Sequence, residues 1–317
     1  MSDNLMQNEQ IKREEDIEED DTLDPGEDFE TPVEVTGLRL RSNDAISPET
    51  VSEFRGNVRT RTVVLVGEQK AGKTTLLASL FGQFCNGPVG RFTFADSRTL
   101  LAFSERRHRA LRKSQRKSPS APRTSRGAPV HFFHLCVADN AGERFNILIS
   151  DRSGEAFDAA RRNTDLLSRL EELAMADFVC FLLDAGKLTN KERRAGYKRK
   201  FRETIKALND NGVLPTTAKV EILVTKLDKL QRAGVDPEVL EEVRRYEADL
   251  RGEFAGKVAS FEVYEVCALP RANFATGVVG LSEMIDRWCL PDAGVDPRPV
   301  PVEDAARHLD RLVGVWE

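Results

Sequence analysis

The sequence has no apolar run of about 18 residues, the length that a helix needs to cross a bilayer. Its first residues are polar and acidic, so we expect no secretion signal. The five cysteines are scattered, odd in number and without a CxxC pair, which argues against a disulfide framework and a zinc site. The four histidines also lack metal-ligand spacing. We therefore expect a cytoplasmic protein with no transmembrane segment.

The charges that are present are unevenly distributed along the chain. Residues 1–34 carry fourteen acidic side chains and only two basic ones, whereas residues 91–126 carry eleven Lys or Arg and two acidic residues. The acidic segment is poor in aromatic and β-branched residues and contains Pro25 and Pro32, so we interpret residues 1–45 as a disordered acidic tail. The composition of 40% hydrophobic and 31% charged residues favours one main domain.

The basic segment allows several roles. It is either a solvated insertion or a surface for nucleic acid or an anionic membrane, to which clustered Lys and Arg bind by counterion release. The acidic tail either adds solubility or lies over this basic insertion as a latch, an attraction that salt screens beyond about 10 Å.

Buried strands alternate with helical segments along most of the chain. Apolar runs occur at residues 62–66, 131–137, 145–150, 177–183, 220–224 and 261–266, and helical spacing at 73–84, 156–175, 191–209, 237–254 and 281–289. This order predicts an α/β, doubly wound sheet that is mostly parallel. The short connection 138–144 predicts a hairpin, hence one antiparallel edge strand. Residues 87–130 interrupt the order and are interpreted as a basic insertion outside the sheet.

A glycine-rich loop follows the first strand and precedes a helix. The sequence GEQKAGKT at residues 67–74 matches the phosphate-binding pattern G-x-x-x-x-G-K-[ST]. Gly67 and Gly72 permit the dihedrals that turn backbone N–H groups inward, Lys73 places an ammonium against β- and γ-phosphates, and the Thr74 hydroxyl suits Mg²⁺. The positive end of the following helix adds to this anion site.

Three further elements each follow a predicted strand, at the sheet edge where open α/β sheets bind ligands. In Asp151-Arg152-Ser153-Gly154, the Asp151 carboxylate can hold Mg²⁺ through water and the Gly154 amide can contact a γ-phosphate. In Thr225-Lys226-Leu227-Asp228, the carboxylate can accept both N1–H and N2–H₂ of guanine. In Cys267-Ala268-Leu269, the Ala268 amide can meet guanine O6.

These four elements together resemble the translation-factor-related class of P-loop GTPases over residues 62–289. The stretch 97–103, the arginine-rich insertion, Pro122-Arg123-Thr124 and residues 151–157 look like the bacterial double-GTPase family. Thr225 replaces the more usual asparagine, although dynamin-like GTPases also have the string TKLD. The resemblance implies GTP/GDP and Mg²⁺ as ligands, a role in a bacterial signalling or conflict system, and a second GTPase or an effector protein as partner.

Four side chains are candidates for the chemistry around the γ-phosphate. Thr124, seven positions before the first hairpin strand, is a candidate switch threonine for Mg²⁺, and Arg123 is either a solvated arginine or a finger in cis. Glu155 stands where many relatives have glutamine, and because a carboxylate repels the developing phosphate charge we expect slow hydrolysis. Lys70 either faces solvent or places its ammonium where cation-activated relatives hold K⁺.

The resulting prediction is a GTP-binding domain at residues 60–290, with insertion 87–130, followed by a C-terminal tail with a short helix at 291–317. The expected function is a slowly hydrolysing GTP switch; the alternatives are a nucleotide-binding interaction module that needs a partner for hydrolysis, and an ATP-using NTPase. The expected catalytic residues are Lys73, Glu155, Arg123 and Thr124, and the expected metal ligands are Thr74, Asp151 and Thr124. The expected nucleotide-binding residues are Gly67, Glu68, Gln69, Lys70, Ala71, Gly72, Lys73, Thr74, Thr75, Gly154, Thr225, Lys226, Asp228, Cys267 and Ala268.

Overall fold

The computed structural model describes residues 44–114, 130–231, 235–270 and 277–290, all within the compact unit Arg41–Glu317. Three sequence-based predictions therefore lie outside the described residues. These are the acidic tail apart from its last two residues, the segment containing Arg123 and Thr124, and the C-terminal helix.

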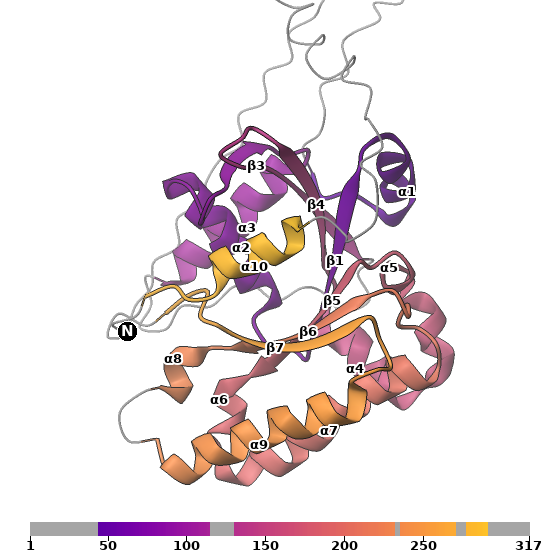
Figure 1. Ribbon diagram of the computed structural model, residues 1–317, viewed down its shortest axis with the longest axis vertical. Coiled ribbons are helices and arrows are strands. Elements are labelled where there is room, and N and C mark those ends of the chain that lie inside the picture. The colour runs from indigo at the N-terminus through magenta and orange to yellow at the C-terminus, as the bar shows by residue number, and fades with distance from the viewer. Residues whose placement is uncertain (1–43, 115–129, 232–234, 271–276, 291–317) are drawn as a thin grey trace, which may run out of the picture. The chain divides into compact units, whose positions relative to one another are not determined.

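The described chain folds around one seven-stranded sheet with the strand order β2-β3-β4-β1-β5-β6-β7 (Figure 1). β1 pairs in parallel with β4 and β5, and the parallel pairing continues through β6 to β7, whereas β3 runs antiparallel to both β2 and β4. The predicted α/β sheet with an antiparallel pair at one edge is thus confirmed. The strands are β1 Thr60–Val66, β2 Thr93–Asp96, β3 His131–Ala138, β4 Arg144–Asp151, β5 Phe178–Asp184, β6 Lys219–Thr225 and β7 Ser260–Val266.

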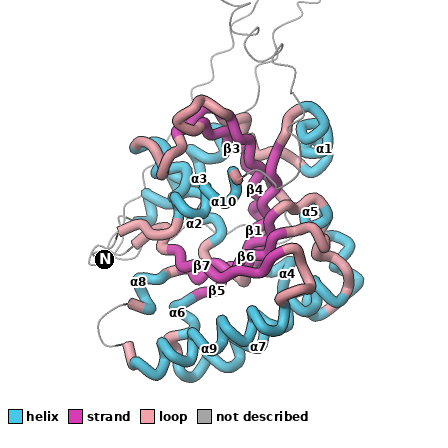
Figure 2. The backbone as a smooth tube through the Cα atoms, in the orientation of Figure 1, coloured by secondary structure: helices cyan, strands magenta, loops and turns pink. Residues whose placement is uncertain are grey.

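Helices cover both faces of the sheet because the central strands are apolar on both sides (Figure 2). On β1, Val63 and Leu65 belong to one buried cluster with α2, α3 and α10, while Val64 and Val66 belong to a second with α4, α7 and α9. α1 packs on β3 and β4. The helices are α1 Pro48–Asn57, α2 Lys73–Asn86, α3 Leu100–Ser114, α4 Gly154–Arg162, α5 Glu171–Ala174, α6 Ala185–Leu188, α7 Lys191–Asp210, α8 Leu227–Leu230, α9 Pro237–Phe254 and α10 Leu281–Cys289.

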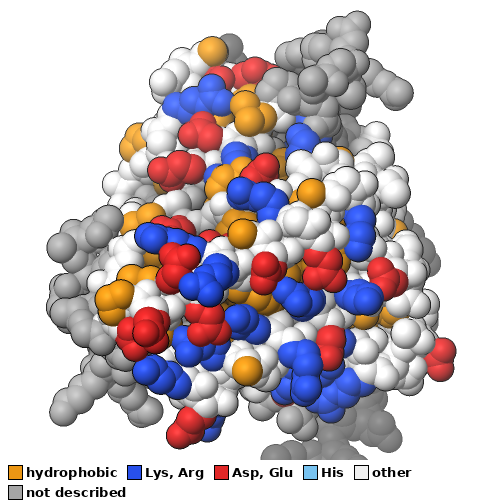
Figure 3. All heavy atoms as spheres, turned by 60° about the horizontal axis from the view of Figure 1, so that its bottom comes forward, with side chains coloured by type: hydrophobic (Ala, Val, Ile, Leu, Met, Phe, Trp, Pro, Cys, Tyr) orange, Lys and Arg blue, Asp and Glu red, His pale blue; other side chains and the backbone are white. Residues whose placement is uncertain are grey.

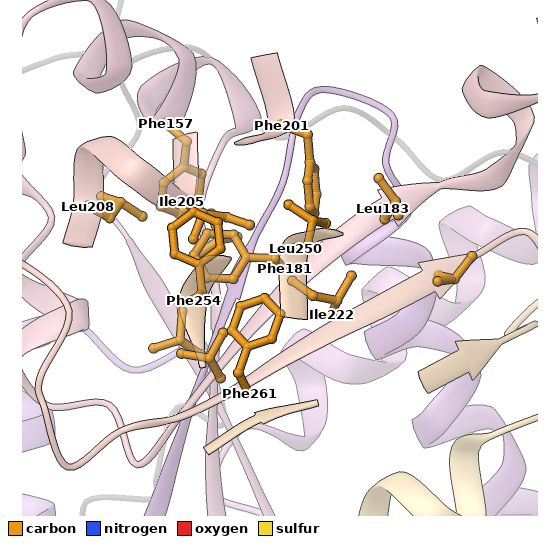
Figure 4. Packing of buried hydrophobic residues seen from close by; sticks show 14 of the residues in the cluster. Phe157, Phe181, Leu183, Phe201, Ile205, Leu208, Ile222, Leu250, Phe254 and Phe261 are labelled. Carbon is orange, nitrogen blue, oxygen red and sulfur yellow. The ribbon is translucent and has the colours of Figure 1, made fainter. Parts of the chain in front are cut away.

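The long helices α7 and α9 present mixed charges to solvent, where basic and acidic side chains are interspersed (Figure 3). Ion pairs join the two helices, for example those of Glu242 with Lys198 at 2.9 Å and with Arg194 at 3.1 Å. Their inner faces are apolar: Phe201 and Ile205 of α7 and Leu250 and Phe254 of α9 belong to one buried cluster on one face of the sheet (Figure 4). This amphipathic pattern is what made both helices predictable.

Two predictions about secondary structure were wrong. The insertion is not wholly outside the sheet, because β2 pairs with β3 and forms the edge of the sheet. The four residues of β2 are largely exposed, and they form no apolar run from which the strand could be predicted. Residues 156–175 do not form one helix. Asn163 ends α4 in an extended conformation and its side chain accepts a hydrogen bond from the Asp165 amide, which starts the 3-10 helix η1, Thr164–Arg169.

Within the described ranges, no helix is both long enough and apolar enough to span a membrane.

Candidate nucleotide-binding site

The predicted phosphate, metal and base elements meet at one edge of the sheet. The glycine-rich loop follows β1, Asp151 ends β4, Thr225 ends β6 and Cys267 follows β7, and these are the carboxyl ends of neighbouring parallel strands. Side-chain contacts described below link all four elements. The fold therefore brings these distant segments of the chain together, as predicted.

The phosphate loop has the backbone conformation that a phosphate cradle needs. Lys70 and Gly72 have positive φ values of 66° and 113°, and Gly72 is the left-handed N-cap of α2. Turning successive residues in this way points N–H groups toward the concave side of the loop. Lys70 is a non-glycine residue in a sparsely populated conformation, which marks the loop as functionally constrained. Its side chain is exposed, and its proposed contact with phosphates stays a prediction.

Lys73 lies inside the loop, almost fully buried. Its ammonium donates to the carbonyl oxygens of Gly67 at 2.6 Å and Glu68 at 3.3 Å. Burial lowers the pKa of Lys73 to about 8, although the Asp151 carboxylate partly opposes this shift. A polyphosphate would stabilise the charged ammonium better than two carbonyl dipoles, so the side chain is suited to an anionic ligand. Thr75, also predicted to bind, lies partly buried in the same first turn of α2.

Thr74 and Asp151 form the metal side of the site. The Thr74 hydroxyl donates to Asp151 Oδ1 over 3.3 Å, and Asp151 is completely buried. Burial raises the pKa of Asp151, while the charges of Arg106 and Lys73 lower it. A hydroxyl and a carboxylate are the protein ligands that Mg²⁺ takes when phosphates supply the remaining oxygens, so this donor set fits Mg²⁺. Among the described residues no cluster of three or more His, Cys, Asp or Glu side chains forms a self-sufficient metal cage.

The segment after Asp151 is packed tightly against the phosphate loop. A Cβ atom on Gly154 would lie 2.4 Å from the Gln69 nitrogen and 2.7 Å from the Gly67 oxygen, so glycine is required at this contact. Ser153 caps α4 by accepting from the Glu155 amide at 3.3 Å, which places Glu155 in the first turn of that helix. The Gly154 backbone therefore touches the loop in which the phosphates would lie.

Arg152 anchors the same segment from the opposite side. Its guanidinium makes two hydrogen bonds to Glu172, of 2.5 and 2.8 Å, and a third to the Arg169 carbonyl at 3.0 Å. Glu172 is completely buried, and a bidentate arginine–carboxylate pair fixes orientation as well as charge. Neither residue was singled out from the sequence. Glu172 lies in the short helix α5, where a charged side chain gives no sign in the sequence that it will be buried.

The predicted base-binding residues are tied to the phosphate loop. The Thr225 hydroxyl donates to the Ala71 carbonyl at 2.8 Å, and the Lys226 ammonium donates to the Lys70 carbonyl at 2.6 Å. Lys226 has a positive φ of 60°, which turns its side chain back toward the loop. A threonine in the usual asparagine position thus still links the base element to the loop through its hydroxyl.

Asp228 is held in place by Cys267. The Cys267 thiol donates to Asp228 Oδ1 at 3.7 Å, and burial raises the pKa of Cys267 to about 11, so the thiol keeps its proton. The backbone of Cys267 exchanges two hydrogen bonds with Val279, which sets the path of the chain into Ala268. Cys267 is therefore best described as a positioning residue for the carboxylate that was predicted to contact guanine.

Two charged residues were missed by the sequence analysis, one at the end of β5 and one in α6 that follows it. Asp184 accepts from the Lys226 ammonium at 2.5 Å, and Lys187 forms an ion pair with Glu68 of the phosphate loop. Asp184 ends a buried parallel strand, just as Asp151 does. The rule that ligand-site residues follow such strands was sufficient to find it, but no short sequence pattern drew attention to it.

The arginine-rich helix α3 also reaches the site. Arg106 Nη2 lies 3.3 Å from Asp151 Oδ2. Among many basic residues of the insertion, only helical spacing from Phe103, which is fully buried, indicates that Arg106 faces inward. The start of the insertion is attached to β3, because Ser97 donates to the His134 carbonyl at 2.6 Å and Thr99 accepts from the His134 amide at 2.9 Å.

Comparison with known proteins adds a family and a fold. The model of the family described as Double-GTPase 2 matches residues 61–289. No curated protein sequence matches the chain.

Solved structures that match the chain include the following three. A variant of Era from Aquifex aeolicus bound to GDP.AlF4⁻ is 17% identical, with a TM-score of 0.36, over 77% of this chain and 61% of that one. The bacterial selenocysteine-specific elongation factor EF-Sec is 14% identical with a TM-score of 0.36, over 72% and 28% of the two chains. The signal recognition particle receptor complex SRb-GTP/SRX from Chaetomium thermophilum is 18% identical with a TM-score of 0.41, over 73% and 97%.

Proposed function

Because the chain belongs to the Double-GTPase 2 family, we propose that this site binds GTP together with Mg²⁺ and hydrolyses the nucleotide slowly, as a molecular switch. The observation that carries the proposal is the connected network at the sheet edge. Thr225 and Lys226 hold the base element against the phosphate loop, and Cys267 orients the Asp228 carboxylate. A ligand that fits both ends must carry a base with adjacent N–H donors and a polyphosphate.

Each residue has a chemical task in this proposal. Lys73 and the loop amides bind the β- and γ-phosphates, Thr74 and Asp151 hold Mg²⁺, and Gly154 presents its amide to the γ-phosphate. Mg²⁺, when bound, neutralises charge that develops on the phosphate oxygens during transfer. On the base side, Asp228 accepts from N1–H and N2–H₂ of guanine, which adenine does not offer.

Slow hydrolysis follows from Glu155. The side chain lies in the first turn of α4, next to the glycine that packs on the phosphate loop. A carboxylate there repels the negative charge of the γ-phosphate, whereas the amide of a glutamine would orient water without that repulsion. The same observation favours the second candidate, a nucleotide-binding module that hydrolyses GTP only when a partner supplies the missing group.

The biological setting is proposed from the family alone. The partner is a second GTPase or an effector of the same system, in a bacterial signalling or conflict pathway, and the location is the cytoplasm.

The specificity of Asp228 provides the sharpest test. Replacing it by asparagine leaves one acceptor but adds an N–H₂ donor, which opposes guanine N2–H₂ and matches the C2 carbonyl of xanthine. We expect Asp228→Asn to weaken GTP binding by about a hundredfold, since two charge-assisted hydrogen bonds contribute about 1.5 kcal/mol each, and to strengthen XTP binding. Asp210→Asn, which changes an exposed carboxylate at the end of α7, serves as the matched control.

Calorimetric titration with GTP, ATP and XTP, followed by a phosphate-release assay, measures these effects. The proposal is wrong if the folded wild-type protein binds no purine nucleotide, or if it prefers ATP. Turnover by the isolated chain supports a hydrolysing switch. GTP binding without turnover supports the partner-dependent module.

A further inference from the structure

Arg106 is held against the metal side of the site by aromatic packing of α3. Phe103 stacks on Phe81 with a centroid distance of 4.9 Å and lies 5.0 Å from Phe133. One turn later on the same helix face, the Arg106 guanidinium lies 5.7 Å from the Phe133 ring centre and 3.3 Å from Asp151. The insertion therefore delivers one cation to the buried carboxylate that also contacts Thr74.

This ion pair is less well satisfied than the other two buried arginine–carboxylate pairs. Arg152 makes two hydrogen bonds to Glu172, and Arg287 makes two to Glu221 at 2.7 and 3.3 Å. Arg106 has a single contact with its carboxylate, and its buried Nε has no hydrogen-bond partner within the described part of the chain. A buried donor without a partner costs about 1–3 kcal/mol, so this pair is the most easily exchanged of the three.

The position of the contact matters because Asp151 is also the expected ligand of Mg²⁺. A completely buried carboxylate needs nearby positive charge, and besides Lys73 it is Arg106 that supplies it, 3.3 Å from an oxygen of the carboxylate that contacts Thr74. A divalent ion beside the same carboxylate would repel the guanidinium at this distance. The guanidinium therefore weakens the attraction of Asp151 for a divalent ion, and the ion weakens the attraction of Asp151 for the guanidinium.

We propose that Arg106 is an internal cation that competes with Mg²⁺ for Asp151, so that binding of the Mg²⁺–nucleotide complex detaches Arg106 and loosens α3. The inference rests on the proposed function, since it requires that the site binds a nucleotide with Mg²⁺. It makes the insertion the segment that responds to the nucleotide, through a contact between two named side chains.

The test measures how the affinity for a fluorescent GDP analogue depends on Mg²⁺ concentration. Arg106→Gln keeps part of the side-chain stem over Phe133 but removes the charge, and we expect it to lower the Mg²⁺ concentration at half-saturation about tenfold. Arg106→Ala should shift it in the same direction. Arg107→Ala is the matched control, because Arg107 lies on the same helix with its Nε near Gly82 of α2 instead of Asp151. It should leave the Mg²⁺ dependence unchanged.

A second measurement does not depend on the variants. Amide hydrogen exchange of peptides from residues 100–107 should become faster when Mg²⁺ and GDP are added to the wild-type protein, and GDP with EDTA should have a smaller effect. Unchanged or weaker Mg²⁺ binding in both Arg106 variants, or slower exchange in α3, overturns the inference. Failure of the wild-type protein to bind any nucleotide would instead refute the proposed function.

Discussion

The anchoring of Arg152 by Glu172 leads to a quantitative prediction about stability. The change Glu172→Gln preserves shape but leaves the Arg152 charge in a site where only 12% of its side chain is exposed. Unit charges about 4 Å apart attract by about 4 kcal/mol at an effective dielectric constant of 20, and losing one partner of a buried pair typically costs about 3–5 kcal/mol. We expect a loss near the lower limit, about 3 kcal/mol, because the Arg169 carbonyl still accepts from Arg152.

Thermal and denaturant unfolding measure this loss. For a domain of this size, about 3 kcal/mol corresponds to a fall in Tm of roughly 9 °C. Glu171→Gln is the matched control, because Glu171 precedes Glu172 and is exposed, and it should change stability by less than about 0.5 kcal/mol.

A double variant distinguishes an unpaired charge from a packing defect. Replacing Arg152 by methionine and Glu172 by leucine removes both charges, and it should recover most of the lost stability because buried ion pairs are replaceable by apolar side chains. The reasoning is refuted if Glu172→Gln is as stable as the wild type, or if the double variant is no more stable than the single one.

Two further predictions concern the phosphate loop. Gly154→Ala should destabilise the protein by about 1–3 kcal/mol, because the added Cβ would overlap the backbone of the phosphate loop. Gly252→Ala in α9, where no atom lies within 4 Å of the added Cβ, is the control and should be neutral or stabilising. Unfolding curves of both variants measure these effects, and equal effects would contradict the prediction. Burial lowers the pKa of Lys73 to about 8, so part of the population is neutral at pH 8.5, and phosphates that restore the ammonium must draw in a proton. Calorimetry at that pH in buffers of different ionisation enthalpy should therefore show proton uptake on nucleotide binding. The affinity for nucleotide should also fall as the pH rises above 8. Binding without proton uptake would contradict the lowered pKa of Lys73.

The same lowered pKa affects stability without nucleotide. The unfolded chain binds the Lys73 proton up to about pH 10.5 and the folded chain only up to about 8. Between these pH values the unfolded state binds more protons, so the contribution of Lys73 to the free energy of unfolding rises with pH. The buried ammonium therefore destabilises the folded state most below pH 8.

The parts of the fold that were predictable are those in which local pattern and burial agree. All six predicted strands are present. Five of them are apolar runs buried in the sheet, whereas β7 at the edge alternates apolar residues with exposed glutamates, and α7 and α9 have a continuous apolar stripe. β2 was missed because a four-residue exposed edge strand has no such pattern, and it exists only through its pairing with β3. The break at Asn163 depends on one side-chain hydrogen bond that competes with the helix.

The candidate site was predictable where a fixed spacing reflects the chemistry of a ligand. The phosphate loop, Asp151, Gly154 and Asp228 were selected in this way; their roles stay predictions, and the structure brings their segments together. Glu172 and Arg106 were missed because their roles come from long-range contacts that adjacent residues do not encode. Their charges resemble those of many exposed residues, and only the tertiary fold shows which of them are buried.

The short strand β2 has a practical consequence for anyone who trims the chain. It pairs with the end of the eight-residue, mostly apolar β3, from Cys136 to Ala138, and the residues that follow it, Ser97 and Thr99, bond the backbone of His134 in the same strand. Excising the insertion to obtain a smaller domain would uncover that ladder of N–H and C=O groups, and exposed strands of this kind pair with copies of themselves. A chain trimmed in this way is therefore expected to associate with itself more readily than the intact chain.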